Sequence, residues 1–157
     1  MAKRTKASRS EESAPFIVGT LKDSRFLEEH AKLFLHDTSR AKIEAKNNIQ
    51  SELNVGVGKS AGKPDTLIVL VRLTVDSVEA ADDTKQIAQY SSVIRHIYEI
   101  AHVYGELDVN AIHIGAVQPY VHLAVTVSAA RAREAFSRLG MPTLDIPINT
   151  SFELTKP

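Results

Sequence analysis

The segment from Gly56 to Ser60, Gly-Val-Gly-Lys-Ser, is the part of the chain that most resembles a phosphate-binding loop. Such a loop needs a further glycine upstream, where this chain has Leu53, and a helix directly after the hydroxyl residue, whose first amide groups point at the phosphate. The residues that follow, 61 to 64, are Ala-Gly-Lys-Pro. Glycine and proline at this density are typical of a turn. The sequence therefore predicts a hairpin loop here and no nucleotide site.

Histidines are the other residues that metal or acid-base chemistry would use. They form no His-Glu-x-x-His pattern, and His96 and His102, which would share a strand face, lack a third ligand for zinc. The sequence has no cysteine, which excludes disulfides and thiolate chemistry, and it has no glycine-framed serine elbow. We expect no catalytic residue, no metal and no cofactor. The six histidines, predicted to be surface or packing residues, are His30, His36, His96, His102, His113 and His122.

Composition indicates one globular domain. The 157 residues are 43% hydrophobic and 24% charged, which is ordinary for a single domain with its own core. Nineteen basic and nineteen acidic residues cancel, so no overall field favours nucleic acid or an anionic membrane. The longest apolar run, 66 to 71, is too short to span a bilayer, and the N-terminus is not a signal peptide. These features predict a cytoplasmic protein.

The N-terminal segment, 1 to 14, is predicted to be a disordered basic arm ahead of a single domain at 15 to 157. It holds Lys3, Arg4, Lys6 and Arg9 among small polar residues, with too little apolar content to pack. A basic arm is also a feature of proteins that bind nucleic acid through phosphates, and that alternative stays open here. The absence of net charge and of stacking aromatic residues argues against it.

Two strands are predicted with the most regular pattern. From 41 to 57, apolar residues occupy most odd positions and polar residues the even ones, which is typical of a strand with one wet face. The stretch from 67 to 78 is apolar on both faces, as expected of a more central strand. Glycines and a proline separate them, so we expect an antiparallel hairpin, with a second reversal at Asp82 to Thr84.

Other segments have ambiguous patterns. Residues 22 to 40 fit either a short helix or an irregular crossover, and 86 to 104 fit a helix or a strand equally well. From 108 to 139 the pattern favours helix, with two helices meeting near Pro119 and a stop at Gly140. The segment 141 to 149, with two prolines, is predicted to be extended.

Four short patches, in this order, resemble the SecB family of export chaperones. The resemblance covers about residues 16 to 152, although the family's Phe-Pro-Tyr-Ala-Arg-Glu signature is not matched at Leu123 to Val127, where it would fall. The matching patches are Lys22-Asp23-Ser24-Arg25-Phe26, similar to the end of the family's first strand; Ile97-Tyr98-Glu99-Ile100, similar to the close of its fourth; Gly115-Ala116-Val117-Gln118-Pro119, similar to its Gly-x-x-Cys-Pro step; and Met141-Pro142-Thr143-Leu144 with Ile146-Pro147-Ile148-Asn149 and Phe152, similar to its extended segment.

The resemblance implies an α+β fold, a four-stranded antiparallel sheet with helices packed on one side, and assembly as a dimer of dimers. It also implies a chaperone that holds unfolded or nascent polypeptides in apolar grooves without nucleotide, a holdase. A holdase needs exposed apolar groups on a scaffold that mixed charge keeps soluble. The client-binding residues expected in the crossover and the extended segment are Phe26, Leu27, Leu33, Phe34, Leu35, Met141, Leu144 and Ile146.

The resemblance also implies docking of the SecA motor through three carboxylates on the outer sheet face. The first corresponds to Asp23. The second falls on Leu27, with Glu28 beside it and expected to point elsewhere, and the third falls on Ser91. Asp23 and Glu28 are thus the candidate partner-binding residues. Because two of three carboxylates are missing, we expect SecA binding to be weak or absent.

A different class of protein is also compatible with the sequence. A structural or regulatory oligomer subunit would have the same fold and the same apolar surfaces, but would bind no client. Exposed apolar surface that binds a hydrophobic dye would favour the chaperone, and a sealed surface would favour the structural subunit.

Overall fold

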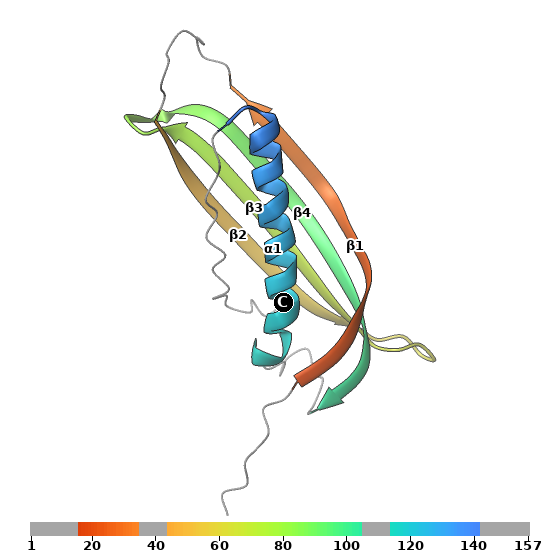
Figure 1. The fold of residues 1–157 in the computed structure, drawn as a ribbon. Helices are drawn as coiled ribbons and strands as arrows, with labels where there is room; N and C mark the ends of the chain where they lie inside the picture. Colours follow the sequence, from red (N-terminus) through yellow and green to blue (C-terminus); the bar gives the residue numbers. More distant parts are fainter. Residues whose placement is uncertain (1–15, 35–43, 105–113, 142–157) are drawn as a thin grey trace, which may run out of the picture.

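The computed structural model describes residues 16–34, 44–104 and 114–141. In chain order its elements are β1 (Phe16–Leu33), β2 (Ala45–Gly58), β3 (Thr66–Glu79), β4 (Asp82–Tyr104) and α1 (Ile114–Arg138). The strands form one antiparallel sheet in the order β1-β4-β3-β2, and α1 packs against one face of it (Figure 1). The predicted α+β fold class is confirmed. The basic arm, His36, His113, Leu35, Leu144 and Ile146 lie outside the described residues.

The predicted hairpin of β2 and β3 is confirmed. Each odd position of β2 faces an odd position of β3, for example Leu53 opposite Val71, and this shared face lies under α1. The connecting loop closes with a bond from the Lys63 amide to the Ser60 carbonyl at 3.1 Å. Gly62 has a φ of 76°, which glycine adopts at little cost. Since β3 and not a helix follows the loop, the segment from Gly56 to Ser60 is a hairpin and lacks the geometry of a phosphate loop.

Residues 82 to 104 form the longest strand, which settles the ambiguity at 86 to 104. β4 lies between β1 and β3 and pairs with both, so each of its faces is covered more than the faces of an edge strand. The reversal before it differs slightly from the expectation: the turn falls at Ala80 and Ala81, and Asp82 begins β4. The Asp82 carboxylate instead accepts bonds from the amide and the hydroxyl of Thr84 at 3.1 and 2.6 Å.

The first strand is longer than predicted. We expected Phe26 to end it and a crossover to begin, but β1 continues to Leu33, paired with β4 throughout. The placement of Phe26, Leu27 and Leu33 in a crossover is therefore wrong. Three register shifts interrupt the pairing, between Val18 and Gly19, Leu21 and Asp23, and Phe26 and Glu28. Such bulges change which side chains face the core, and this is why the apolar pattern of this segment has no regular period.

The helix is a single element, so the two helices expected to meet at Pro119 are a second incorrect prediction. Pro119 lies inside α1, where it removes one backbone donor without ending the helix. The predicted stop at Gly140 is confirmed. Gly140 has a φ of 73°, and the Met141 amide returns to the Phe136 carbonyl at 3.0 Å, which is a common helix ending.

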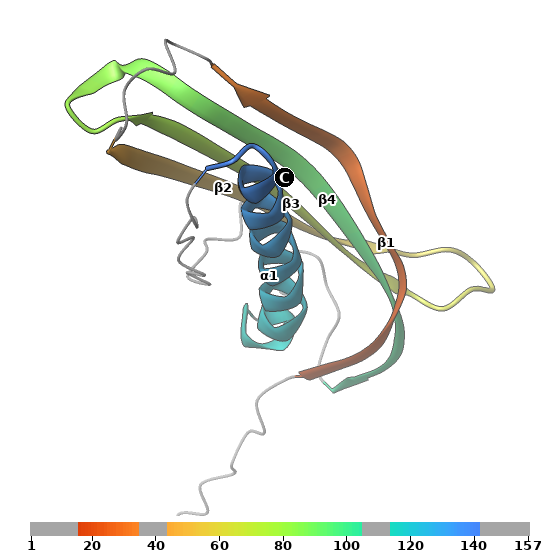
Figure 2. The same ribbon diagram turned by 45° about the horizontal axis from the view of Figure 1, so that its top comes forward.

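The core lies between α1 and the sheet in two clusters. The first surrounds Leu67, Val69, Ile94, Tyr98 and Val121 near the start of the helix. The second surrounds Leu73, Val75, Tyr90 and Phe136 near its end, with Leu33, Leu139 and Met141 packed against it. Figure 2 shows the twisted sheet arching over α1, with β1 curving along one side of the helix. The opposite face of the sheet carries no helix in the described part of the chain.

Candidate polypeptide-binding surfaces

β1 carries most of the large apolar side chains that are exposed on the described surface. Five large apolar side chains are well exposed among the described residues, and four of them lie on this strand. These four are Phe16, Val18, Leu21 and Leu27, with exposures from 42% to 48%. The fifth, Leu123, lies on α1. β1 lies at one end of the sheet that the described strands form. Exposed apolar side chains on an edge strand favour association with another polypeptide.

A groove lies between the second half of β1 and the last turns of α1. Its volume is about 280 Å³, and its apolar floor is made by Ala31, Ala135 and Leu139. Leu33 and Met141, two of the predicted client-binding residues, pack with Ala135 and Leu139 against the same core cluster. An open groove with an apolar floor is the form that most peptide and ligand sites take. The side chains that make its charged rim are Glu29, Arg131, Glu134 and Arg138.

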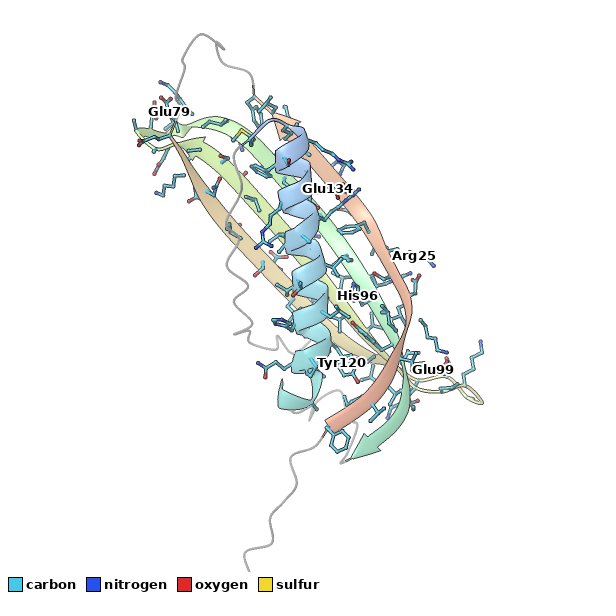
Figure 3. The ribbon with its side chains drawn as sticks, in the orientation of Figure 1. Arg25, Glu79, His96, Glu99, Tyr120 and Glu134 are labelled. Atoms are coloured by element: carbon cyan, nitrogen blue, oxygen red, sulfur yellow. The ribbon has the colours of Figure 1, made fainter. Side chains whose placement is uncertain are left out.

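The rim of the groove is held by ion pairs. Arg131 binds Glu29 with two bonds, at 2.7 and 3.1 Å, and Glu134 at 2.8 Å. Arg138 also bonds to Glu134, which Figure 3 shows on the side of α1 toward β1. The bonds from Arg131 hold the pKa of Glu29 below its usual value, and burial raises the pKa of Tyr90, whose hydroxyl also reaches Glu29, to about 12. These charges fix β1 to the helix without covering the apolar floor.

The outer sheet face, opposite the helix, carries Asp23 and Glu28. Asp23 lies between Arg25 and Arg95, at 2.8 and 3.0 Å, and the bonds from these arginines lower its pKa. Figure 3 shows Arg25 projecting from the outside of β1. The expectation that Glu28 points elsewhere is wrong, because the bulge at Leu27 places Glu28 opposite Val93, on the face where Asp23 lies opposite Ile97. Both carboxylates share one face, but Asp23 is already neutralised.

The predicted client-binding residues are divided between two places. Leu33 and Met141 both pack against the core cluster beside the groove. Phe26 is half-buried against the first core cluster, under the Arg131 guanidinium at 5.9 Å from the ring centre, and Leu27 is exposed on β1. Phe34 is half-buried with the Lys32 ammonium 4.5 Å from its ring centre. The structure therefore brings only part of this set together.

Several surface residues were missed by sequence reasoning. The residues that were not among the expected binding residues are Phe16, Val18, Leu21, Leu123, Ala135 and Leu139. Nothing local distinguishes an exposed apolar residue on an edge strand from a buried one on a central strand. The tertiary position of β1 was needed to find them.

Within 16–34, 44–104 and 114–141, no three metal-ligating side chains come together. The described helix, α1, is not long and apolar enough to cross a bilayer.

The sheet order and the single helix across one face define the class of fold, a divergent SecB-like α+β fold. A solved structure with this arrangement is "a SecB-like chaperone" of Mycobacterium tuberculosis in complex with a ChAD peptide from the HigA1 antitoxin. It is 16% identical, with a TM-score of 0.60 over 82% of this chain and 90% of that one. A protein of unknown function from Streptococcus agalactiae is 10% identical, with a TM-score of 0.48 over 83% and 98% of the two chains. No protein-family profile and no curated protein matches the sequence.

Proposed function

We propose that this protein is a SecB-like molecular chaperone that holds unfolded or nascent polypeptides without nucleotide. The observation that carries the proposal is the groove beside β1, with its apolar floor at Ala31, Ala135 and Leu139 inside a charged rim. Apolar contacts suit many client sequences because they require no fixed donor or acceptor, and the rim keeps the site in water. The SecB-like chaperone of similar fold, solved with a peptide bound, is consistent with this function.

The client site includes the residues around this groove. Leu33 and Met141 pack against the same core cluster as its residues Ala135 and Leu139. The sequence continues from them into Phe34 and Leu35 on one side and Leu144 and Ile146 on the other. Phe26 and Leu27 lie further along β1 and extend the apolar surface beyond the groove. A client segment in an extended conformation would follow β1 and contact these residues in turn.

We also propose that the chain forms a homotetramer. It has two separate apolar surfaces, the β1 edge and the outward side of α1, where Leu123 is exposed and where the sequence from 114 to 130 contains no Asp, Glu, Lys or Arg. Two different self-complementary surfaces on one chain produce a dimer of dimers. Light scattering at micromolar concentration tests this, and a monomer there contradicts it.

SecA is a weak partner or no partner in this proposal. Asp23 is engaged by two arginines, and neither Leu27 nor Ser91 supplies a charge. The expected location is the cytoplasm, and neither membrane nor nucleic acid is an expected partner.

The direct test is suppression of aggregation. The purified full-length protein is mixed, without nucleotide, with a chemically denatured client diluted from denaturant, and light scattering is followed. We expect a stoichiometric decrease in scattering that ATP does not change. Unchanged aggregation at a tenfold molar excess contradicts the holdase function.

A second candidate is a structural or regulatory oligomer subunit without client activity. The observation that favours it is the same exposed β1 edge, since copies of the chain that bury this edge against one another would leave little apolar surface for clients. An oligomer that binds no hydrophobic dye and suppresses no aggregation would support this candidate.

A further inference from the structure

A buried histidine lies at the centre of the contact between the sheet and the helix. His96 is on the α1-facing side of β4, 1% exposed, between Ser24 of β1 and Val69 of β3 in the strand register. Its Nδ1 lies 2.9 Å from the Tyr98 hydroxyl. Its Nε2 is buried and has no hydrogen-bond partner among the described residues.

The surrounding bonds select one neutral form of His96. The Tyr98 hydroxyl lies 3.4 Å from the Tyr120 carbonyl of α1 and donates a hydrogen bond to it. It therefore accepts a hydrogen bond from the N–H at Nδ1 of His96. Nε2 is then the unprotonated nitrogen, and its lone pair is buried. A proton added at Nε2 would create a buried cation and a donor without an acceptor, and both are costly.

Tyr120 connects this histidine to the clamp between α1 and β1. The Tyr120 hydroxyl donates to the Ile17 carbonyl at 2.6 Å and accepts from the Gly19 amide at 2.9 Å, on either side of the first register shift of β1. The Tyr98 and Tyr120 rings meet edge to face, with centres 4.6 Å apart. Figure 3 shows His96 and Tyr120 between the helix and the sheet. Movement of Tyr98 would therefore disturb the clamp.

Among the residues that the structure describes, those facing His96 offer no unengaged acidic group to stabilise its protonated form. β3 presents Leu67, Val69, Val71, Leu73, Val75 and Ser77 toward the helix. β4 contributes the neutral phenols of Tyr90 and Tyr98, and α1 contributes Tyr120 and Arg131. β1 contributes Glu29, whose carboxylate already accepts hydrogen bonds from Arg131 and Tyr90.

We propose that His96 is an acid-sensitive switch, and that its protonation releases the first half of α1 from β1. Release breaks the Tyr120 clamp and uncovers the first core cluster, which includes Ile17, Tyr98 and Val121. The protein would thus expose more apolar surface in mildly acidic solution than at neutral pH. This inference is independent of client binding, because it concerns the packing of one chain.

The direction of the pH dependence follows from burial. Desolvation lowers the pKa of His96 in the folded chain, whereas in the unfolded chain the pKa is about 6.5. The unfolded state therefore binds the proton more tightly, so stability is full above about pH 6.5 and falls as the pH decreases from there toward the folded pKa. The unfolding equilibrium constant therefore rises as the pH falls from 8 to 5, by at most about tenfold for each pH unit below about 6.5.

Denaturation at pH 8 and pH 5 tests this with His96→Leu. We expect the rise in the wild type to shrink by about tenfold in the variant, which lacks the imidazole at position 96 and keeps the other titratable groups. His30→Gln and His122→Gln, at exposed positions of β1 and α1, serve as matched controls and should keep the wild-type rise. Equal pH profiles for wild type and His96→Leu would overturn the proposal.

Hydrogen exchange of the wild type provides a second test that needs no folded His96 variant. Protection of the Gly19 amide, corrected for the intrinsic rate, should fall at least about tenfold between pH 7.5 and pH 5, while the Leu73 amide in the second cluster keeps its protection. Tyr120→Phe, which removes only the clamp hydroxyl, should show the same loss at Gly19 already at pH 7.5. If NMR shows His96 titrating while Gly19 stays protected, the switch does not exist.

Discussion

The two edge strands of the sheet, β1 and β2, differ in the side chains that they expose and in the regularity of their pairing. β1 exposes four large apolar side chains, is interrupted by three register shifts and curves along the helix. β2 keeps an unbroken register with β3 over its whole length and presents Lys46, Asn48, Gln50, Glu52 and Asn54 on the face away from α1. Charged and amide side chains on an edge strand discourage pairing with other chains. These features make β1 the more suitable of the two edges for association with another chain.

The largest expected effect comes from charging the β1 edge. Val18→Lys with Leu21→Lys should weaken self-association by about a hundredfold or more, because a buried interface does not tolerate two unpaired lysines. Sedimentation velocity over a dilution series measures the change.

The matched control lies on β2. Asn48→Lys with Gln50→Lys adds the same two charges to the other edge and should leave the association constant unchanged. Equal weakening by both pairs would show that net charge, and not the β1 surface, controls assembly.

The next largest effect concerns the groove on the β1 side. Leu139→Ser with Met141→Ser should raise the dissociation constant of a fluorescent unfolded client by about thirtyfold, since each serine removes apolar surface worth ~1 kcal/mol. Fluorescence anisotropy measures the affinity.

Leu70→Ser is the control for the groove, because Leu70 is half-buried on the opposite face of the sheet. It should leave client affinity unchanged although it removes similar apolar surface. Loss of affinity in the control alone would place the client site on the outer face.

A smaller effect is expected on the outer face of β1. Leu27→Glu with Ser91→Glu restores two carboxylates to the sheet that carries Asp23, so affinity for the basic zinc domain of SecA should rise by about tenfold through charge complementarity. Calorimetry at physiological salt measures it. Submicromolar binding by the wild type would show that Asp23 and Glu28 suffice.

The smallest expected effect concerns the ion pair that ties β1 to the helix. Because Arg131 lowers the pKa of Glu29, the unfolded chain binds the Glu29 proton more tightly, and the stability from this pair is lost as the pH falls below about 4.5. Glu29→Gln should therefore lower the midpoint of thermal unfolding slightly at pH 7 and not at pH 3. A decrease of equal size at both pH values would indicate lost packing instead.

Regular patterns made the β2-β3 side predictable. The alternation of apolar and polar residues from 41 to 57 is typical of a strand with one face in water. The apolar run from 67 to 78 is typical of a strand whose two faces are both covered. The glycines and the proline between them mark a turn whatever surrounds it, and Gly140 ends the helix for the same local reason. The resemblance to SecB added the fold, although it placed the end of the first strand seven residues too early.

The sequence by itself determined the hairpin, the end of the helix and the single-domain composition, because each depends on neighbours along the chain. Only the tertiary structure decided that β1 reaches Leu33, that 86 to 104 is a strand and that the helix continues through Pro119. Pairing on both sides of β4 and packing of α1 against the sheet outweigh the local preferences there. The groove, the exposed β1 edge and the buried His96 likewise depend on residues distant in sequence, so no local pattern reveals them.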